Sequence, residues 1–315
     1  MLSWAAALIL ATASPASAKP SEVVVGAYLN DIQNLDLKTH SYEADVYLWF
    51  RWRGAQLDPA ASVEFNNPNE LWGHARSAAY EKPEKLPDGS FYQVLRVQGR
   101  FSRKLPLEQY PFDKQVLTVE FEDARHEAPD LVFVPDTPAL AVNPDLKLPG
   151  YKLGAAKLEI SEYVYPSGFG DPRRKAHTRY SRVSVSQAIE RPALAYAVKL
   201  ILPVLCVIFC ASLLFLFNPR YVDARAGIGI TALLTIVALQ ITLNEDLPEV
   251  DYLILMDKIY LGAYFFVIGA LGVVVRTTKL VDQGKEARAR SLDRWALGGM
   301  LAAFLIGTAG LFLAR

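Results

Sequence analysis

A helical stripe of small, hydroxyl-bearing and apolar side chains in the last third of the chain could line a path for water and ions. The apolar segment 224–243 carries Thr231, Thr235, Gln240 and Thr242, and such polar groups are costly in hydrocarbon unless they find partners or water. At about 3.6 residues per turn, positions spaced alternately four and three residues apart share one helix face. The stripe consists of Gly227, Thr231, Leu234, Ala238 and Ile241, with Asp223 before it and Glu245 after it. This pattern is typical of a helix that lines an aqueous pore.

The middle and the ends of this stripe suggest a gate and a charge filter. A narrow apolar ring, here of Leu234 side chains, can block ions by dewetting. Around a shared axis Asp223 forms a carboxylate ring at one mouth, while Glu245 and Asp246 form rings at the other, and carboxylate rings favour cations. Arg225 lies about 200° from Asp223 around the helix, so we expect it to face neighbouring protein or the cytoplasmic rim. One helix cannot enclose water alone, which predicts a closed ring of identical subunits.

The stripe belongs to the second of four apolar segments that predict membrane-spanning helices. Each segment is near the ~20 residues that cross a bilayer core. The segments are 193–217, 224–243, 253–275 and 295–314. Basic side chains gather in the 276–294 linker and the 218–224 loop has Arg220, whereas the 244–252 loop has acidic residues and no lysine or arginine. The positive-inside rule therefore puts the first two in the cytoplasm and the acidic loop outside.

The region 19–191 has the pattern of β structure. In 42–52, Val46 and Phe50 fall on one face and Asp45 on the other, as in a half-buried strand. Further strand candidates cover 115–121 and 180–189, with Pro- and Gly-rich turns between them. Many short strands over such a length predict an antiparallel β-sandwich ahead of the four-helix membrane bundle.

The remaining composition narrows the function classes. Residues 1–18 combine an apolar run with an Ala-x-Ala site, which predicts a secretory signal peptide. The formal net charge is zero and gives no reason to expect nucleic acid as a partner. Cys206 and Cys210 lie four residues apart, a poor spacing for a disulfide within a helix, and we expect small apolar core thiols. No nucleophile elbow, metal-binding helix motif or phosphate-binding glycine loop occurs, so we expect no enzyme, no metal and no cofactor.

Five short motifs in the correct order resemble the pentameric ligand-gated ion channels, the Cys-loop receptor superfamily. Tyr110, Pro111, Phe112 and Asp113 resemble the signature loop of that family. The other motifs are Val46-Tyr47-Leu48 with Trp52, Arg191-Pro192, Ile201-Leu202-Pro203, and Leu247-Pro248 with Tyr252. The resemblance covers nearly the whole mature chain. It implies a homopentamer with an outer ligand-binding domain at 19–191, a membrane domain at 192–315 and a pore lined by the second span.

Two departures from the family pattern point to its prokaryotic branch. Arg103 and Leu117 stand where eukaryotic members carry the two cysteines of the signature loop. The 276–294 linker is also too short for the large intracellular domain of animal receptors. The resemblance thus implies a multi-pass protein of a bacterial inner membrane with a periplasmic amino-terminal domain.

The resemblance also implies how binding reaches the pore. The 110–113 loop would rest on the linker that contains Leu247, Pro248 and Tyr252, and Asp113 would pair with Arg191 at the junction. Pro203, within the first span, removes a backbone hydrogen bond and is expected to bend that helix.

Agonists of the family bind between neighbouring subunits in a box of aromatic side chains. The candidate box residues here are Tyr47, Tyr163, Tyr165, Phe169 and Tyr180. In the 71–76 segment Trp72 is kept, but His74 replaces a usual proline, and Ala124 stands where the central binding tryptophan is expected. Cation–π capture needs stacked aromatic faces, so the alanine argues against a cholinergic-type agonist.

Two other agonist chemistries remain open. Arg76 and Arg96 fall on strands that border the same site in the family, and two guanidiniums could receive a carboxylate. Protons are a further candidate agonist, with His40, His126 and His177 as possible titrating groups.

Two alternative functions also remain open. Residues 224–231 resemble the start of the pore helix in the family's anion channels, except that Asp223 replaces a proline, so an anion-selective member is one alternative. The other is a membrane-tethered periplasmic binding or sensor protein without conduction. For a cation channel or an anion channel, the expected partners are membrane lipids, permeating ions and an agonist that is a small molecule or a proton.

Overall fold

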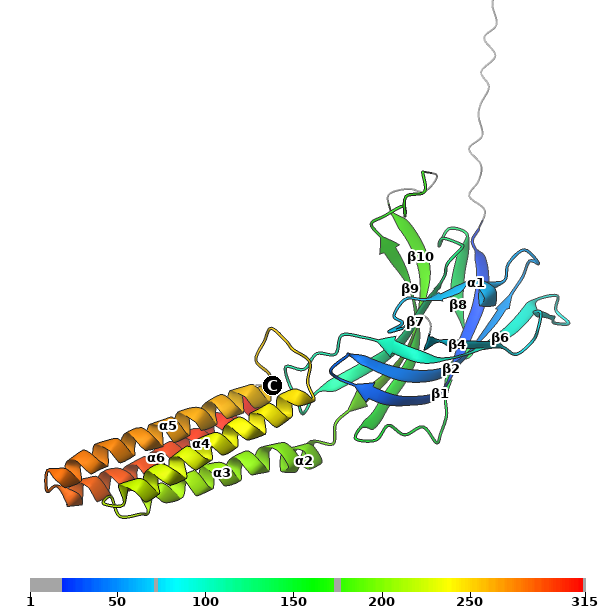
Figure 1. The fold of residues 1–315 in the computed structure, drawn as a ribbon. Helices are drawn as coiled ribbons and strands as arrows, with labels where there is room; N and C mark the ends of the chain where they lie inside the picture. The colour runs from blue at the N-terminus through cyan, green and yellow to red at the C-terminus, as the bar shows by residue number, and fades with distance from the viewer. Residues whose placement is uncertain (1–18, 71–72, 173–176, 314–315) are drawn as a thin grey trace, which may run out of the picture.

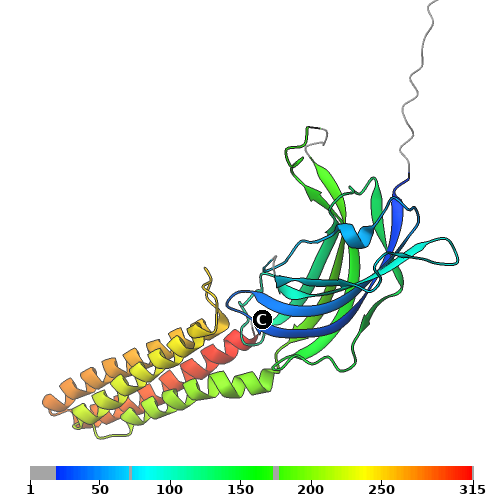
Figure 2. The same cartoon turned by 45° about the vertical axis from the view of Figure 1, so that its right-hand side comes forward.

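The computed structural model describes residues 19–70, 73–172 and 177–313, which form a β-domain followed by a helical bundle (Figure 1). The predicted signal peptide at 1–18 and Trp72 lie outside the described residues. Figures 1 and 2 show the bundle extending from one end of the β-domain, with the carboxyl end of the chain near the junction.

Two sheets make up the β-domain. The strands are β1 (Ser21–Asp36), β2 (Ser41–Trp52), β3 (Val63–Phe65), β4 (Ala75–Ala78), β5 (Glu84–Lys85), β6 (Phe91–Ser102), β7 (Lys114–Asp123), β8 (Leu131–Val142), β9 (Lys152–Tyr165) and β10 (Thr178–Glu190), with a short helix α1 (Pro59–Ser62) before β3. The first sheet has the order β4-β6-β2-β1-β8 with β5 on β6, and the second has the order β3-β7-β10-β9. Strands β1 and β8 pair in parallel, while the other described strand pairs are antiparallel as expected.

The core lies between the two sheets. Val46, Leu48 and Phe50 of β2 are fully buried, which confirms the alternation predicted for 42–52. Phe50 meets Phe121 of β7 edge to face, with ring centroids 6.1 Å apart. Apolar side chains at every second position of both sheets thus close the sandwich.

Four helical segments are long and apolar enough to cross a membrane. The first combines α2 (Ala193–Tyr196), a π-helical turn (Ala197–Ile201), α3 (Leu202–Ser212) and a 3₁₀ turn (Leu213–Phe215); the others are α4 (Val222–Glu245), α5 (Leu255–Asp282) and α6 (Glu286–Leu313). The π turn ends just before Pro203, whose missing N–H disfavours a regular helix there.

The helices run past the predicted apolar segments. The expected linker at 276–294 is helical except at 283–285, because α5 and α6 continue through its charged residues. Lysine, arginine, glutamate and alanine are good helix formers, so a helix does not stop where hydrocarbon ends. The apolar pattern therefore marks the membrane-embedded part of these helices rather than their ends.

The two cysteines differ in part from the prediction. Cys206 and Cys210 are both free, but both are exposed on the surface of the bundle rather than in its core. A helix of this hydropathy presents apolar side chains on all sides, so periodicity does not separate core from surface positions.

Candidate functional site

Every residue of the predicted stripe lies on the face of α4 that points away from the other helices of its own subunit. The exposed stripe residues are Asp223, Gly227, Thr231, Leu234, Ala238, Ile241 and Glu245. On the opposite face Gly229, Ala232 and Ile236 are buried against the bundle. Leu234 is 64% exposed and Ile241 56% exposed, which is similar to apolar side chains on the outer faces of the other helices, such as Phe265 and Ile306. The single subunit thus leaves this face without a protein partner among the described residues.

Hydrogen bonds within the subunit satisfy several of the polar side chains of α4. The hydroxyl groups of Thr235 and Thr242 donate to the carbonyl oxygens of Thr231 and Ala238, at 2.8 and 3.1 Å. Gln240 accepts a 2.6 Å hydrogen bond from the hydroxyl of Tyr264 on α5. These polar groups therefore do not by themselves require water. The stripe differs from the other exposed helix faces in its small side chains, the hydroxyl of Thr231, and the carboxylates of Asp223 and Glu245 at its ends, and this composition is the stronger indication of a pore.

A buried ion pair joins the β-domain to the first membrane helix. Arg191 Nε donates to Asp113 Oδ1 at 2.8 Å, and both side chains are less than 5% exposed. The guanidinium also lies 4.7 to 5.1 Å from the ring centroids of Tyr110, Tyr151 and Tyr196. Burial opposes the charge on Arg191, but Asp113 outweighs it and the pKa of Arg191 is raised. The predicted pairing is present, and an aromatic cage that includes two unpredicted tyrosines surrounds it.

The 110–113 loop packs on the α4–α5 connection. Tyr110 belongs to the same buried apolar cluster as Leu247, with Phe112 and Tyr252 at its edge, and Pro248 lies in the same connection. Backbone N–H groups bridge the two parts. Leu107 N donates to the hydroxyl of Tyr252, and Leu255 N donates to the carbonyl of Glu108, both at 3.0 Å.

The carboxyl end of the chain reaches the same junction. Phe312 of α6 meets Phe112 edge to face, with ring centroids 5.5 Å apart. Sequence reasoning missed Leu107, Glu108, Tyr151, Tyr196 and Phe312. These residues meet only because of the way the β-domain packs on the helical bundle, and no local sequence motif predicts that packing.

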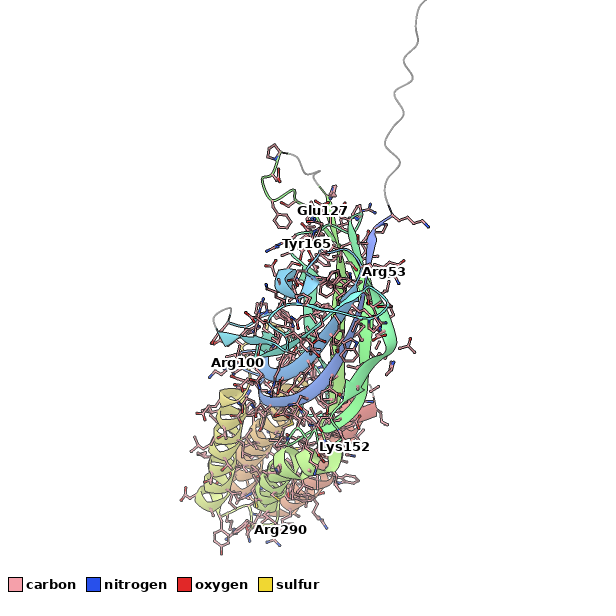
Figure 3. The ribbon with its side chains drawn as sticks, turned by 90° about the vertical axis from the view of Figure 1, so that its right-hand side faces the viewer. Arg53, Arg100, Glu127, Lys152, Tyr165 and Arg290 are labelled. Atoms are coloured by element: carbon pink, nitrogen blue, oxygen red, sulfur yellow. The ribbon has the colours of Figure 1, made fainter. Side chains whose placement is uncertain are left out.

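Four of the predicted box residues form one cluster at the part of the β-domain far from the bundle, where Figure 3 labels Tyr165. Ring centroids of Tyr163, Phe169 and Tyr180 lie 4.7, 5.3 and 5.7 Å from that of Tyr165. A cavity of about 320 Å³ opens beside them. Its lining residues are Glu64, Asn66, Glu122, Asp123, Ala124, Tyr165, Phe169 and Tyr180.

An arginine that sequence reasoning missed organises this cluster. Arg182 of β10 stacks 3.6 Å from the ring centroid of Tyr163 and donates to Glu122 at 2.6 Å and to the hydroxyl of Tyr165 at 2.9 Å. The Tyr165 hydroxyl in turn donates to Glu122 at 3.1 Å. Burial and the Glu122 charge raise the pKa of Tyr165 to about 12, so this hydroxyl stays protonated. Arg182 and Glu122 are cross-strand neighbours, a relation that only the strand register reveals.

The other predicted ligand residues, Tyr47, Arg76 and Arg96, lie on the first sheet, and both arginines already have hydrogen-bond partners within the subunit. Arg96 binds Asp45 through two hydrogen bonds of 3.0 and 2.7 Å and stacks on Tyr47. Arg76 donates to the backbone carbonyl of Val63. Within the single subunit Asp45 already occupies the two N–H groups of Arg96 that a carboxylate ligand would need. The pair of arginines for a carboxylate ligand stays a prediction.

The three histidines do not form a cluster. His40 accepts a hydrogen bond from Leu105 N, and burial lowers the pKa of its imidazole. His126 contacts Asp123 at 2.9 Å, and His177 is exposed. Among the described residues no group of three or more histidine, cysteine, aspartate or glutamate side chains could hold a metal ion.

Comparisons with known proteins complete the description of the site. No family profile matches the chain. A proton-gated ion channel of Gloeobacter violaceus is 24% identical over 89% of this chain and 79% of its own length. A gamma-aminobutyric acid receptor subunit beta-4 of Gallus gallus is 27% identical over 80% of this chain, and an acetylcholine-gated chloride channel subunit of Caenorhabditis elegans is 23% identical over 87%. The chain spans 54% and 63% of the length of these two animal proteins.

Proposed function

Because the chain belongs to the superfamily of pentameric ligand-gated ion channels, we propose that five copies form a ring in which α4 lines a gated, cation-selective pore. The observation that carries this proposal is the exposed stripe from Asp223 to Glu245, opposite a face buried in the subunit's own bundle. Five such faces around one axis enclose a continuous path, with Leu234 as its apolar constriction. A tether without conduction has no use for a hydroxyl group and terminal carboxylates, those of Thr231, Asp223 and Glu245, on an exposed face of a membrane helix.

The sign of the permeating ion follows from the charged residues at the pore mouths. Asp223 is exposed at the start of α4, and five copies give a carboxylate ring at the cytoplasmic mouth. Glu245 and Asp246 add exposed carboxylates at the outer mouth, where they concentrate cations. The relatives include a chloride channel subunit, so anion selectivity is the alternative that the measurement of reversal potential decides.

We place the agonist site between neighbouring subunits, at the aromatic cluster of β9 and β10. The cluster around Tyr165 supplies one wall, and the face of the first sheet that carries Tyr47, Arg96 and Arg76 supplies the other wall from the adjacent copy. Glu122 is already paired with Arg182, so it is the carboxylate of Glu64 beside the cavity that favours a cationic or neutral small molecule over an anion. Protonation of such carboxylates is the second route by which this region could respond, and the Gloeobacter relative is named as proton-gated.

Binding at this cluster reaches the pore through the junction. The 110–113 loop, Arg191 and the connection that contains Leu247, Pro248 and Tyr252 form one packed contact between β-domain and bundle. A displacement of the loop therefore acts directly on the outer end of α4.

The membrane placement follows from charge and order. We propose that a cleaved signal at 1–18 exports the ligand-binding domain 19–191 to the periplasm of a bacterial cell, and that 192–315 spans the inner membrane. Basic residues at 276–294, such as Arg290, then face the cytoplasm at the far end of the bundle (Figure 3).

Electrical recording from the purified protein in planar bilayers tests this function. We expect stepwise currents that appear when the outer solution is acidified or when small amines are added, and five-fold symmetric particles in detergent. A monomeric protein that never conducts under either condition would instead favour the tethered binding protein.

A further inference from the structure

One buried guanidinium links all four membrane helices at their cytoplasmic ends. Arg225 of α4 is completely buried, and each of its nitrogens bonds a different segment. Nε donates to the carbonyl of Leu214, in the 3₁₀ turn that ends the first span, at 2.9 Å. Nη1 donates to the hydroxyl of Thr277 on α5 at 3.1 Å, and Nη2 donates to Asp293 on α6.

The chemistry of this cluster requires arginine. Its planar fork presents N–H groups in fixed, divergent directions, which the single ammonium of lysine cannot reproduce. The carbonyl of Leu214 lies at a helix end, where carbonyl groups lack intrahelical partners and accept such donors. The cluster therefore fixes the rotation of the first turn of α4, two residues from Asp223.

The charge of Arg225 has one counter-charge among the described residues. The side chain of Asp293 is 3% exposed, and its ion pair with Arg225 is the only one it makes there. A charge in such surroundings must be paired, since burial of a lone ion is very costly. In a ring, five Arg225 side chains lie behind the pore wall at the level of the Asp223 carboxylates, and their charge is weakly screened because water and salt do not reach them.

We propose that Asp293 is a specificity-determining residue: its carboxylate cancels the charge of Arg225, so that the Asp223 ring alone sets the potential at the cytoplasmic mouth. This inference rests on the proposed function, in which α4 lines the pore. It assigns a role in ion selectivity to α6, a helix whose own residues do not line the proposed pore.

The test is the reversal potential of reconstituted channels in a KCl gradient. Asp293→Asn keeps an oxygen acceptor for Arg225 but removes the counter-charge, and we expect the potassium-to-chloride permeability ratio to fall about threefold or more. Arg225→Met with Asp293→Leu removes both charges at similar volume, and this pair should restore the parent ratio. The matched control is Glu286→Gln, which removes another acid of α6, one that pairs with Arg220 in the loop before α4, and it should leave the ratio unchanged.

The outcomes separate this inference from the proposed function. A parent protein that never conducts overturns both. If the parent conducts and Asp293→Asn has the parent's reversal potential, the pore assignment stands and the role of Asp293 is wrong. Where Asp293→Asn fails to assemble, Asp293→Gln, a second neutral acceptor, takes its place. A lowered ratio that the double variant restores supports the proposal, whereas the parent ratio, or loss of pentamers in both neutral variants, shows that the cluster acts on structure alone.

Discussion

Leu234 lies midway along α4 with its side chain directed away from the subunit, and in a ring five of these side chains face one another. An apolar constriction holds the closed state because water leaves it. Leu234→Thr or Leu234→Ala should therefore ease opening and give higher agonist sensitivity or spontaneous current. The control is Leu239→Ala, the same change at a half-buried position on another face of the helix. Equal effects of the two alanine variants on the dose–response curve would show that Leu234 is not the constriction.

The buried Arg191–Asp113 ion pair gives a second prediction at the scale of residues. Charge reversal of either residue leaves a buried charge without its partner and should reduce gating. The double reversal should recover about 1 kcal/mol or more of the loss, as coupled neighbours do in double-mutant cycles. Agonist dose–response curves, with surface protein measured in parallel, give the four values of the cycle. Strictly additive losses would mean that the two residues act separately.

At the scale of elements, the connection between α4 and α5 carries the link between the two parts of the chain. Tyr252→Phe removes the hydroxyl that accepts from Leu107 N and leaves that N–H unpaired, a loss of about 1–3 kcal/mol. We expect reduced agonist sensitivity, and Pro248→Ala should act in the same direction. The control in the same assay is Tyr221→Phe, which removes the hydroxyl of an exposed tyrosine at the start of α4. A Tyr252→Phe curve that overlays the control would remove this connection from the coupling route.

Sequence periodicity predicts the elements that have one buried face. The alternation of Val46 and Phe50 gives the inner face of β2, and the stripe through Leu234 gives the exposed face of α4, since both depend on spacing alone. The partners of the arginines cannot be predicted from spacing, because they depend on strand register. Arg96 meets Asp45 only once β6 is aligned on β2, and Arg182 meets Glu122 only once β10 is aligned on β7. The ends of α5 and α6 differ from the apolar segments because charged residues also form helix.

For the whole molecule, we expect the charge at the cytoplasmic mouth of the pore to set the selectivity for cations over anions. Asp223→Asn removes five carboxylates from the ring and should lower the cation-to-anion permeability ratio. Asp282→Asn, an exposed acid at the end of α5, is the matched control and should have no such effect. Reversal potentials in a salt gradient measure both. A parent reversal potential near that of chloride would overturn cation selectivity itself.

The central claim is that the exposed face of α4 lines the ion path, and cysteine accessibility tests it most directly. In a background where the exposed Cys206 and Cys210 are replaced by serine, Thr231→Cys and Ala238→Cys lie on the stripe, and Ile236→Cys lies on the buried face. A charged, water-soluble thiol reagent applied to open channels should block current irreversibly at the two stripe positions and leave Ile236→Cys unaffected. Block at Ile236→Cys with no reaction at the stripe would contradict the account.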